Sequence, residues 1–248
     1  MTARGRAGNL LLLFARGRPD VAVMKRVASE TEQLSVTSVL ESGDANATCG
    51  VELLRDGMTF DLLGALPGPS FPVPPLVHRL GVPRDLDESS AEALSLHCGP
   101  HLDQGAHTVP VIRTMMGVAT MLVPHLPGLT ALAWGPARTL IGPDFFVSSM
   151  SAWLAGGAFP ALGLTAFTPE PDGSLVSEGL AFFTGQEVRL RPDVANDRAA
   201  GARLGIRLVN QLVGQSKVGA AETIVGPSGE RLRLAPSADG LTVVVQRG

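Results

Sequence analysis

The chain has 248 residues, of which 45% are hydrophobic and 17% charged, and its formal net charge is −3. This composition is typical of a globular protein and excludes an intrinsically disordered chain. The acidic balance argues against the basic face that nucleic-acid binding requires. No uninterrupted apolar run reaches the length of a membrane-spanning helix, so we expect neither a nucleic-acid nor a membrane partner.

The cysteines and the N-terminal residues indicate a reducing compartment. Cys49 and Cys98 cannot build a disulfide framework, and their separation fits no metal-binding motif. The apolar run at 10–15 is too short for a signal peptide, and arginines follow where small cleavage-site residues should stand. We therefore expect a cytoplasmic protein. The preference for Arg over Lys, with abundant Ala, Gly, Leu and Pro, indicates a GC-rich bacterial genome.

In the first part of the chain, short apolar and β-branched runs alternate with one helical pattern. The expected helix covers 19–32, and the expected strands are 9–15, 34–40 with a turn at 42–44, 51–54, 58–63 and 94–98. Asp56-Gly57 between two apolar runs predicts a β-hairpin. Five prolines in 67–75 (PGPSFPVPP) predict an extended linker or a long crossing loop.

Residues 105–126 (GAHTVPVIRTMMGVATMLVPHL) are apolar over most of the circumference of a helix. Only Arg113, Gly117 and Thr120 form a narrow polar or small stripe, which is typical of a buried helix. Prolines follow at 124 and 127 and end the helical pattern. We expect a central helix that is covered by sheet or by other helices.

The second part repeats strands, helices and hairpins. Strands are expected at 129–134, 162–168, 175–183, 187–190, 223–225, 231–234 and 241–246, and helices at 142–156 and from Asp193 or Asn196 to 215. Together the elements predict an α+β fold with a mixed, mostly antiparallel sheet on the central helix and about three further helices. We expect one domain over 1–248, and a subdivision into 1–66 and 76–248 across the proline-rich segment stays open.

Common catalytic and nucleotide-binding motifs are absent from the sequence, and we expect no cofactor. The densest set of metal-ligating residue types is the stretch HCGPHLDQGAH, with His97, Cys98, His101, Asp103 and His107. Imidazole, thiolate and carboxylate groups bind zinc, and these ligands could converge on a loop. Their spacing matches no closed zinc site. The favoured interpretation is a turn that leads into the central helix, with Cys98 as a small core residue.

The candidate binding residues outside this stretch are Arg113, Trp134, Glu178 and Glu187. Arg113 on the central helix is a candidate buried charge, and Glu178 or Glu187 could supply the carboxylate that it would need. Such a pair is more often structural than functional. Trp134 and Trp153 are expected in the core, and one of them could line a pocket.

Residues 129–191 carry three stretches that fit a known pattern: TALAWGPARTLIGPDFF, FPALGLTAF and VSEGLAFFTGQEVRL. They resemble the bacterial "domain of unknown function 4261" family. Its terminal signature would be filled by Gly179, Leu180, Phe183, Gly185 and Glu187. The departures are an extra Thr184 and the pair Ser177-Glu178, where Thr with Arg or another residue is expected. The resemblance implies a bacterial protein without an established activity and adds no catalytic residue.

Two functions remain. The favoured one is a non-enzymatic, protein-binding or accessory (immunity-type) module, because no catalytic constellation is evident and so many hairpins imply exposed sheet edges. The alternative is a small-molecule hydrolase or metal-dependent enzyme with a site near His97–His107, where the start of the central helix could hold an anion. A homodimer is left open. Replacing His101 and His107 should spare partner binding under the first hypothesis.

Overall fold

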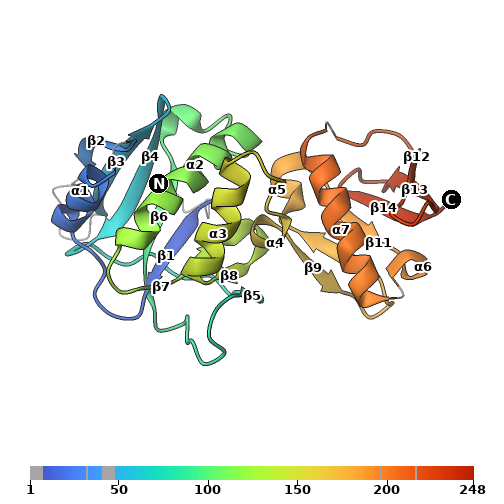
Figure 1. Cartoon of the computed structure of the whole chain (residues 1–248), viewed down its shortest axis with the longest axis horizontal. Helices are drawn as coiled ribbons and strands as arrows, with labels where there is room; N and C mark the ends of the chain where they lie inside the picture. Colours follow the sequence, from blue (N-terminus) through green and yellow to red (C-terminus); the bar gives the residue numbers. More distant parts are fainter. Residues whose placement is uncertain (1–7, 32, 41–47, 196, 216) are drawn as a thin grey trace. The chain divides into compact units, whose positions relative to one another are not determined.

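The computed structural model describes residues 8–31, 33–40, 48–195, 197–215 and 217–248. The chain divides into two compact units, Met1–Gly157 and Ala158–Gly248 (Figure 1). The proline-rich segment 67–75 lies inside the first unit and not between the units. Whether the whole chain folds as one domain, or with a division across that segment, stays a prediction.

The first unit is built on an eight-stranded sheet with the order β2-β3-β4-β6-β1-β7-β8-β5. Its strands are β1 (Leu10–Phe14), β2 (Ser35–Leu40), β3 (Cys49–Arg55), β4 (Met58–Ala65), β5 (His78–Leu80), β6 (Glu92–Cys98), β7 (Leu129–Trp134) and β8 (Thr139–Ile141). Neighbouring strands are antiparallel except for β5 and β8, which are parallel. The predicted hairpin is confirmed, because Asp56 and Gly57 join β3 to β4 with φ angles of 49° and 76°.

One face of this sheet carries α1 (Val21–Ser29), α2 (Val109–Leu122) and α3 (Pro143–Leu154) (Figure 1). The predicted central helix is α2, which packs on β4, β6 and α3 and buries Ile112, Met116 and Ala119. Three 3-10 turns, η1 (Pro100–Leu102), η2 (Val123–His125) and η3 (Gly135–Ala137), flank the longer elements. Pro124 lies in η2, where the α-helical pattern ends as expected.

The opposite face of the same sheet is covered by the chain between β4 and β6. Phe71, Val73, Leu76, Val82, Leu86 and Ala91 pack on a cluster of Leu11, Leu13, Ala93, Ala131, Ala133 and Leu140. The Phe71 N–H donates to the Ala93 carbonyl at 3.1 Å. The buried Arg18 side chain donates to the carbonyls of Gly64 and Gly68. The proline-rich segment is therefore a cover that is bonded to the sheet.

The second unit contains a six-stranded sheet with the order β12-β13-β14-β11-β10-β9. Its elements are α4 (Ala161–Leu164), β9 (Ala166–Pro169), β10 (Leu175–Glu178), α5 (Leu180–Thr184), β11 (Glu187–Leu190), α6 (Pro192–Ala195), α7 (Arg198–Val213), β12 (Glu222–Val225), β13 (Arg231–Pro236) and β14 (Thr242–Arg247). Only β11 and β14 pair in parallel among the described ladders of this sheet. Leu204, Leu208 and Leu212 of α7 pack on one of its faces, as their spacing predicts.

The structure shows the expected α+β class with two mixed, mostly antiparallel sheets. Two predicted strands are wrong in part, because 162–168 begins with α4 and 175–183 ends with α5. The N-cap of α7 is Asp197, whose carboxylate accepts from the N–H groups of Ala199 and Ala200. Asn196 and the predicted turn at 42–44 lie outside the described residues. In the described part of the chain, none of the helices has the length and apolar character needed to span a bilayer.

Candidate functional site

The histidine-rich stretch begins on β6, in the middle of the first sheet. His97 is 3% exposed, and its Nε2 lies 3.7 Å from Oδ2 of Asp61, its register partner on β4. Cys98 is half-buried, and burial raises the pKa of its thiol to about 11, with a smaller contribution from the Asp103 charge. A thiol with this pKa is protonated near neutral pH and is a poor nucleophile and metal ligand.

The remaining residues of this stretch lie apart on the surface. His101 belongs to η1, and its Nδ1 is 3.3 Å from Oγ1 of Thr59. Asp103 and His107 are exposed on the turn that leads into α2. Within the described ranges, no three His, Cys, Asp or Glu side chains gather where they could hold a metal ion. The five candidate ligands are therefore not gathered into one group in this structure, and metal binding by them stays a prediction.

The strands β6 and β4 also bring together a serine, a histidine and an aspartate, the residue types of a hydrolase triad. Ser95 and His97 lie two residues apart on β6 and therefore point to the same side of the sheet, and Asp61 faces His97 from β4. A Ser-His-Asp constellation needs a serine hydroxyl that a substrate can reach. Ser95 is 0% exposed and His97 is nearly as buried, so the row is packed inside the unit. This geometry does not provide an active site.

Arg113 stabilises the end of a neighbouring helix. Its Nη2 donates to the carbonyls of Trp153 and Leu154, at 3.2 and 2.7 Å, at the C-terminus of α3. A cation at a helix C-terminus is favourable because the last carbonyls carry partial negative charge. The expected carboxylate partner is thus replaced by two backbone carbonyls. Trp134, at the end of β7, is 0% exposed, and both tryptophans lie in the core of the first unit.

Glu187 is an internal anion of the second unit. Its carboxylate accepts from the N–H groups of Gly179, Leu180 and Ala181, at 2.9, 3.2 and 3.0 Å, and from the Ser177 hydroxyl. Burial raises the pKa of Glu187, and these four hydrogen bonds act in the opposite direction. The carboxylate therefore fixes the first turn of α5. Glu178, the other carboxylate predicted as a partner for Arg113, is half-buried on β10.

The hydrogen bonds of Glu187 and the turn that they fix give a structural role to residues of the signature at 179–187. Gly179 and Gly185 flank α5 with φ angles of 90° and 76°, which favour glycine. Phe183 packs edge-on against Phe159 and Phe182, with ring centroids 5.1 and 5.0 Å apart. The signature therefore builds and caps a helical turn. Membership of the family stays a prediction.

A surface groove of about 560 Å³ lies between α1 and β2, the strand at one edge of the first sheet. Its lining from α1 is Lys25, Ala28 and Ser29, and its lining from the following chain is Leu34, Ser35, Val36, Thr37, Ser38 and Val39. The floor is apolar, because Ala28 and Leu34 are buried. No acidic residue is among the described lining residues.

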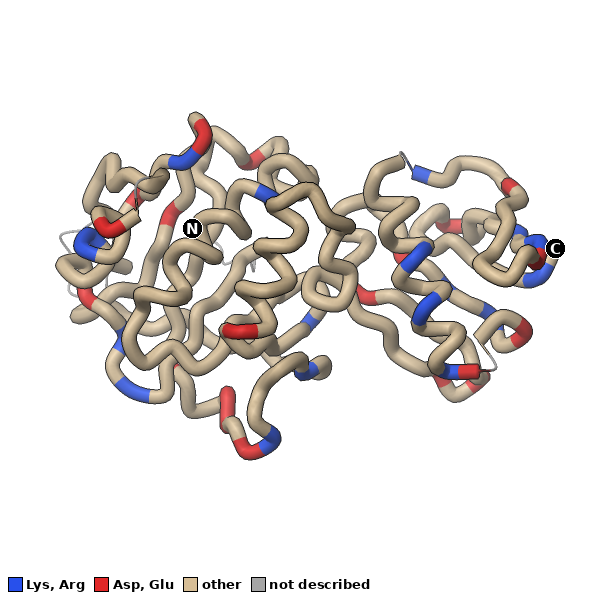
Figure 2. Tube along the Cα trace, viewed as in Figure 1, with Lys and Arg blue, Asp and Glu red and all other residues tan. Residues whose placement is uncertain are grey.

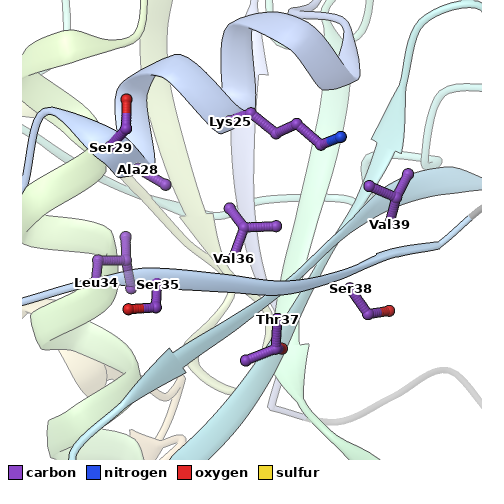
Figure 3. A pocket seen from close by; sticks show the side chains of 9 residues that line it. All are labelled: Lys25, Ala28, Ser29, Leu34, Ser35, Val36, Thr37, Ser38 and Val39. Carbon is purple, nitrogen blue, oxygen red and sulfur yellow. The ribbon is translucent and has the colours of Figure 1, made fainter.

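A β-bulge sets which β2 side chains face the groove. Val36 pairs with Leu53 and Ser38 with Glu52, so Thr37 is the extra residue. Thr37 instead donates through its hydroxyl to the Glu52 carboxylate. As a result, Val36 and Val39, three residues apart, both point towards α1, while Lys25 extends above them (Figure 3). The groove combines two aliphatic side chains with one amine.

The comparisons with known proteins give no further information on this site. No family model, no curated protein and no solved structure matches the chain. Sequence reasoning did not find the groove, because it depends on the position of β2 at a sheet edge. The only signal was the β-branched run LSVTSVL close after a helix that carries one of the two lysines of the chain.

Proposed function

We propose that the protein is a non-enzymatic, protein-binding or accessory module of the bacterial cytoplasm, of the immunity type. Its binding site would be the α1–β2 groove, and its ligand an extended segment of a partner protein. The observation that carries the proposal is the apolar groove beside an edge strand. Cys49 and Cys98 are not joined in a disulfide, which agrees with a reducing compartment.

An edge strand offers backbone hydrogen-bonding groups on its outer side, and an added strand can pair with them. Among the described strands, β2 has only β3 as a neighbour in the sheet order. A segment paired with β2 would place alternate side chains over Val36 and Val39. Lys25 would then select a carboxylate, since it makes no ion pair with the described residues and no described acidic side chain lines the groove.

The bulge at Thr37 favours a specific partner over self-association. A long, flat edge pairs readily with another copy of itself, and a bulge twists the edge away from such pairing. Only the short stretch Ser35–Leu40 is available on β2. We therefore expect binding to one complementary segment, and no homodimer through this edge.

The first test is a pull-down from the native bacterium with quantitative mass spectrometry, followed by purification of any near-stoichiometric protein. The chain with Lys25→Glu is compared with the chain with Arg26→Glu, a change of equal charge at an exposed neighbour outside the groove. Reversing a charge that pairs with a carboxylate should weaken binding of the purified partner about tenfold. Arg26→Glu should change it less than about twofold.

Hydrogen exchange of the complex locates the contact. Protection of the β2 amides on addition of the purified partner supports pairing along this edge. Equal effects of both substitutions, or protection confined to other elements, would refute the groove as the site. The double change His101→Ala with His107→Ala should leave binding intact. The hydrolase or metal-enzyme alternative stays a prediction, and loss of a measured activity in that variant would support it.

A further inference from the structure

One face of the second sheet is open within its unit and carries four arginines. The helix α7 packs on the face that contains Val188, Leu190, Leu232 and Leu234. Strand alternation and register place a larger set of described residues on the other face, all half-buried or exposed: Ala166, Thr168, Val176, Glu178, Glu187, Arg189, Arg191, Thr223, Val225, Arg231, Arg233, Ala235, Thr242, Val244 and Gln246. Lys and Arg positions lie among the C-terminal strands, with Asp and Glu positions beside them (Figure 2).

The strand register places these arginines on the two sides of β14. Arg189 on β11 is the partner of Val244, and Arg233 on β13 is the partner of Gln246. Arg231 follows on β13 at the same face, since it lies two residues from Arg233. Arg191, directly after β11, lies on the same face, and its Nη1 is 3.5 Å from Oε1 of Gln246 on β14. The result is a basic end of the face around the last residues of β14, while Glu178 and Glu187 lie towards its other end.

One arginine of this face already pairs with a carboxylate of its own unit. Nη2 of Arg189 lies 2.7 Å from Oδ2 of Asp172, an exposed acidic side chain on the turn between β9 and β10. Asp172 is also held by the hydroxyl and N–H of Ser174, so its position is fixed. Arg231 and Arg233 are exposed, and their guanidinium groups have no acceptor among the described residues. They are available for carboxylates of another chain.

We infer that this face binds an extended, acidic segment of a partner protein, with carboxylates at alternate positions. Side chains two residues apart in a strand lie about 6.8 Å apart on one face. The same spacing separates Arg231 from Arg233, so alternating Asp or Glu residues of an extended segment match it. Arginine suits such a contact because its planar guanidinium can bind a carboxylate through two hydrogen bonds.

The observations favour a protein segment over a nucleic acid. Single-stranded nucleic acids bind through aromatic side chains on which the bases stack, together with a basic groove. No aromatic side chain is among the described residues of this face, because Phe167 of β9 points to Gly205 of α7. In addition, the second unit has equal numbers of acidic and basic residues.

The inference rests on the proposed protein-binding function but uses a surface distinct from the α1–β2 groove. The test uses the full chain and a short fluorescein-labelled peptide of alternating Glu and Ser, whose binding is measured by anisotropy at about 50 mM salt. Three comparison ligands are the peptide with Gln for Glu, a peptide with its glutamates in one block, and single-stranded oligothymidine. Lys25→Glu should not affect this binding, so failure of either proposal can be recognised separately.

The decisive variant is Arg231→Ala with Arg233→Ala, and its control is Arg203→Ala with Arg207→Ala. The control removes two exposed arginines of the same unit from α7. We expect the first variant to bind the alternating peptide at least about fivefold more weakly, and the control to stay within about twofold. Lys at both positions should restore part of the affinity, because it keeps the charge.

Several outcomes would overturn the inference. They are absence of binding to the alternating peptide, equal losses in the two alanine variants, and tighter binding of oligothymidine than of the peptide. Equal affinity for the alternating and the blocked peptide would refute the spacing argument. Circular dichroism of both variants confirms that they remain folded.

Discussion

The two sheets differ in how many of their faces are covered within their own units. In the first sheet, helices cover one face and the chain between β4 and β6 covers the other. In the second sheet, α7 covers one face, and the other has no buried residue among those described. The strands reflect this difference: β1 (LLLLF) is buried at all five positions, whereas half-buried and buried residues alternate over the first five positions of β14 (TVVVQ).

Under the proposed protein-binding function, the comparison indicates where the molecule would accept partners. A sheet covered on both faces can be reached only at its edges, which directs attention to β2 and the α1–β2 groove. A sheet with one open face can bind through its side chains, and its arginines then determine the partner. The two units thus offer two different kinds of surface, an edge and a face.

The largest effect is expected from replacing Arg18, which holds the chain between β4 and β6 on the first sheet. Arg18→Met should lower the free energy of unfolding by about 3 kcal/mol, because two charge-assisted hydrogen bonds to the buried carbonyls of Gly64 and Gly68 are lost. Both tryptophans of the chain lie in the first unit, so urea unfolding followed by tryptophan fluorescence reports on this unit.

Arg79→Met is the matched control for this change. Arg79 bonds the same cover to itself, through Glu88 and the carbonyls of Pro83 and Leu86, but its side chain is 33% exposed. A loss of about 1 kcal/mol or less is expected there. Faster hydrogen exchange of the Phe71 amide should accompany only Arg18→Met. Equal losses of unfolding free energy in the two variants would contradict this role of Arg18.

The fold was predictable where a local pattern decides the structure. The apolar circumference of α2, the Asp56-Gly57 turn and the leucine spacing of α7 need only residues close in sequence. The strand predicted at 175–183 failed after Glu178, because a carboxylate eight residues away caps the N–H groups of α5. The proline-rich segment was predicted as a linker or crossing loop, and the apolar side chains that make it a cover pack on strands far along the chain.

The candidate site was less predictable, because strand order and backbone partners, not a local pattern, bring its residues together. Residue types alone gathered His97, Cys98 and His101 into one hypothesis, although neighbouring positions on a strand point to opposite faces. The partner of Arg113 was missed because backbone carbonyls carry no signal in a sequence. The α1–β2 groove and the open face depend on strand order, which local periodicity does not define.

A smaller effect is expected from the internal anion of the second unit. Glu187→Gln should lower its free energy of unfolding by about 2 kcal/mol, because the amide cannot accept all four hydrogen bonds of the carboxylate. The second unit has no tryptophan, so hydrogen exchange of the β11 and β14 amides provides the measurement. An unchanged exchange rate in these strands would contradict the assigned role.

The same substitution has a defined dependence on pH. The folded-state pKa of Glu187 is raised above its ordinary value of 4.5, so the folded state binds more protons than the unfolded state between these two values. The contribution of this group to stability therefore falls as the pH rises through that window. The stability difference between the natural chain and Glu187→Gln should shrink over the same window. A difference that grows with pH would show that hydrogen bonding outweighs burial.

The smallest effect concerns how closely a helix approaches its sheet. A Cβ on Gly205 of α7 would lie 2.6 Å from Cζ of Phe167, a half-buried side chain of β9 that packs against the core of the second unit. Overpacking costs about 1–3 kcal/mol, and the higher helix propensity of alanine offsets about 1 kcal/mol of it. Gly205→Ala should therefore destabilise the second unit by about 1 kcal/mol in the same hydrogen-exchange measurement.

Gly117→Ala on α2 sharpens this prediction, because the same added methyl group meets a different neighbour. Its Cβ would lie 2.7 Å from Nη1 of Arg55, the far end of a flexible side chain that can move aside. The gain in helix propensity then remains, and tryptophan fluorescence should show the first unit unchanged or stabilised by up to about 1 kcal/mol. If both alanines destabilise their units equally, the close approach of Phe167 is not the reason for a glycine at position 205. The helix α7 would then pack no more tightly on the second sheet than α2 packs on the first.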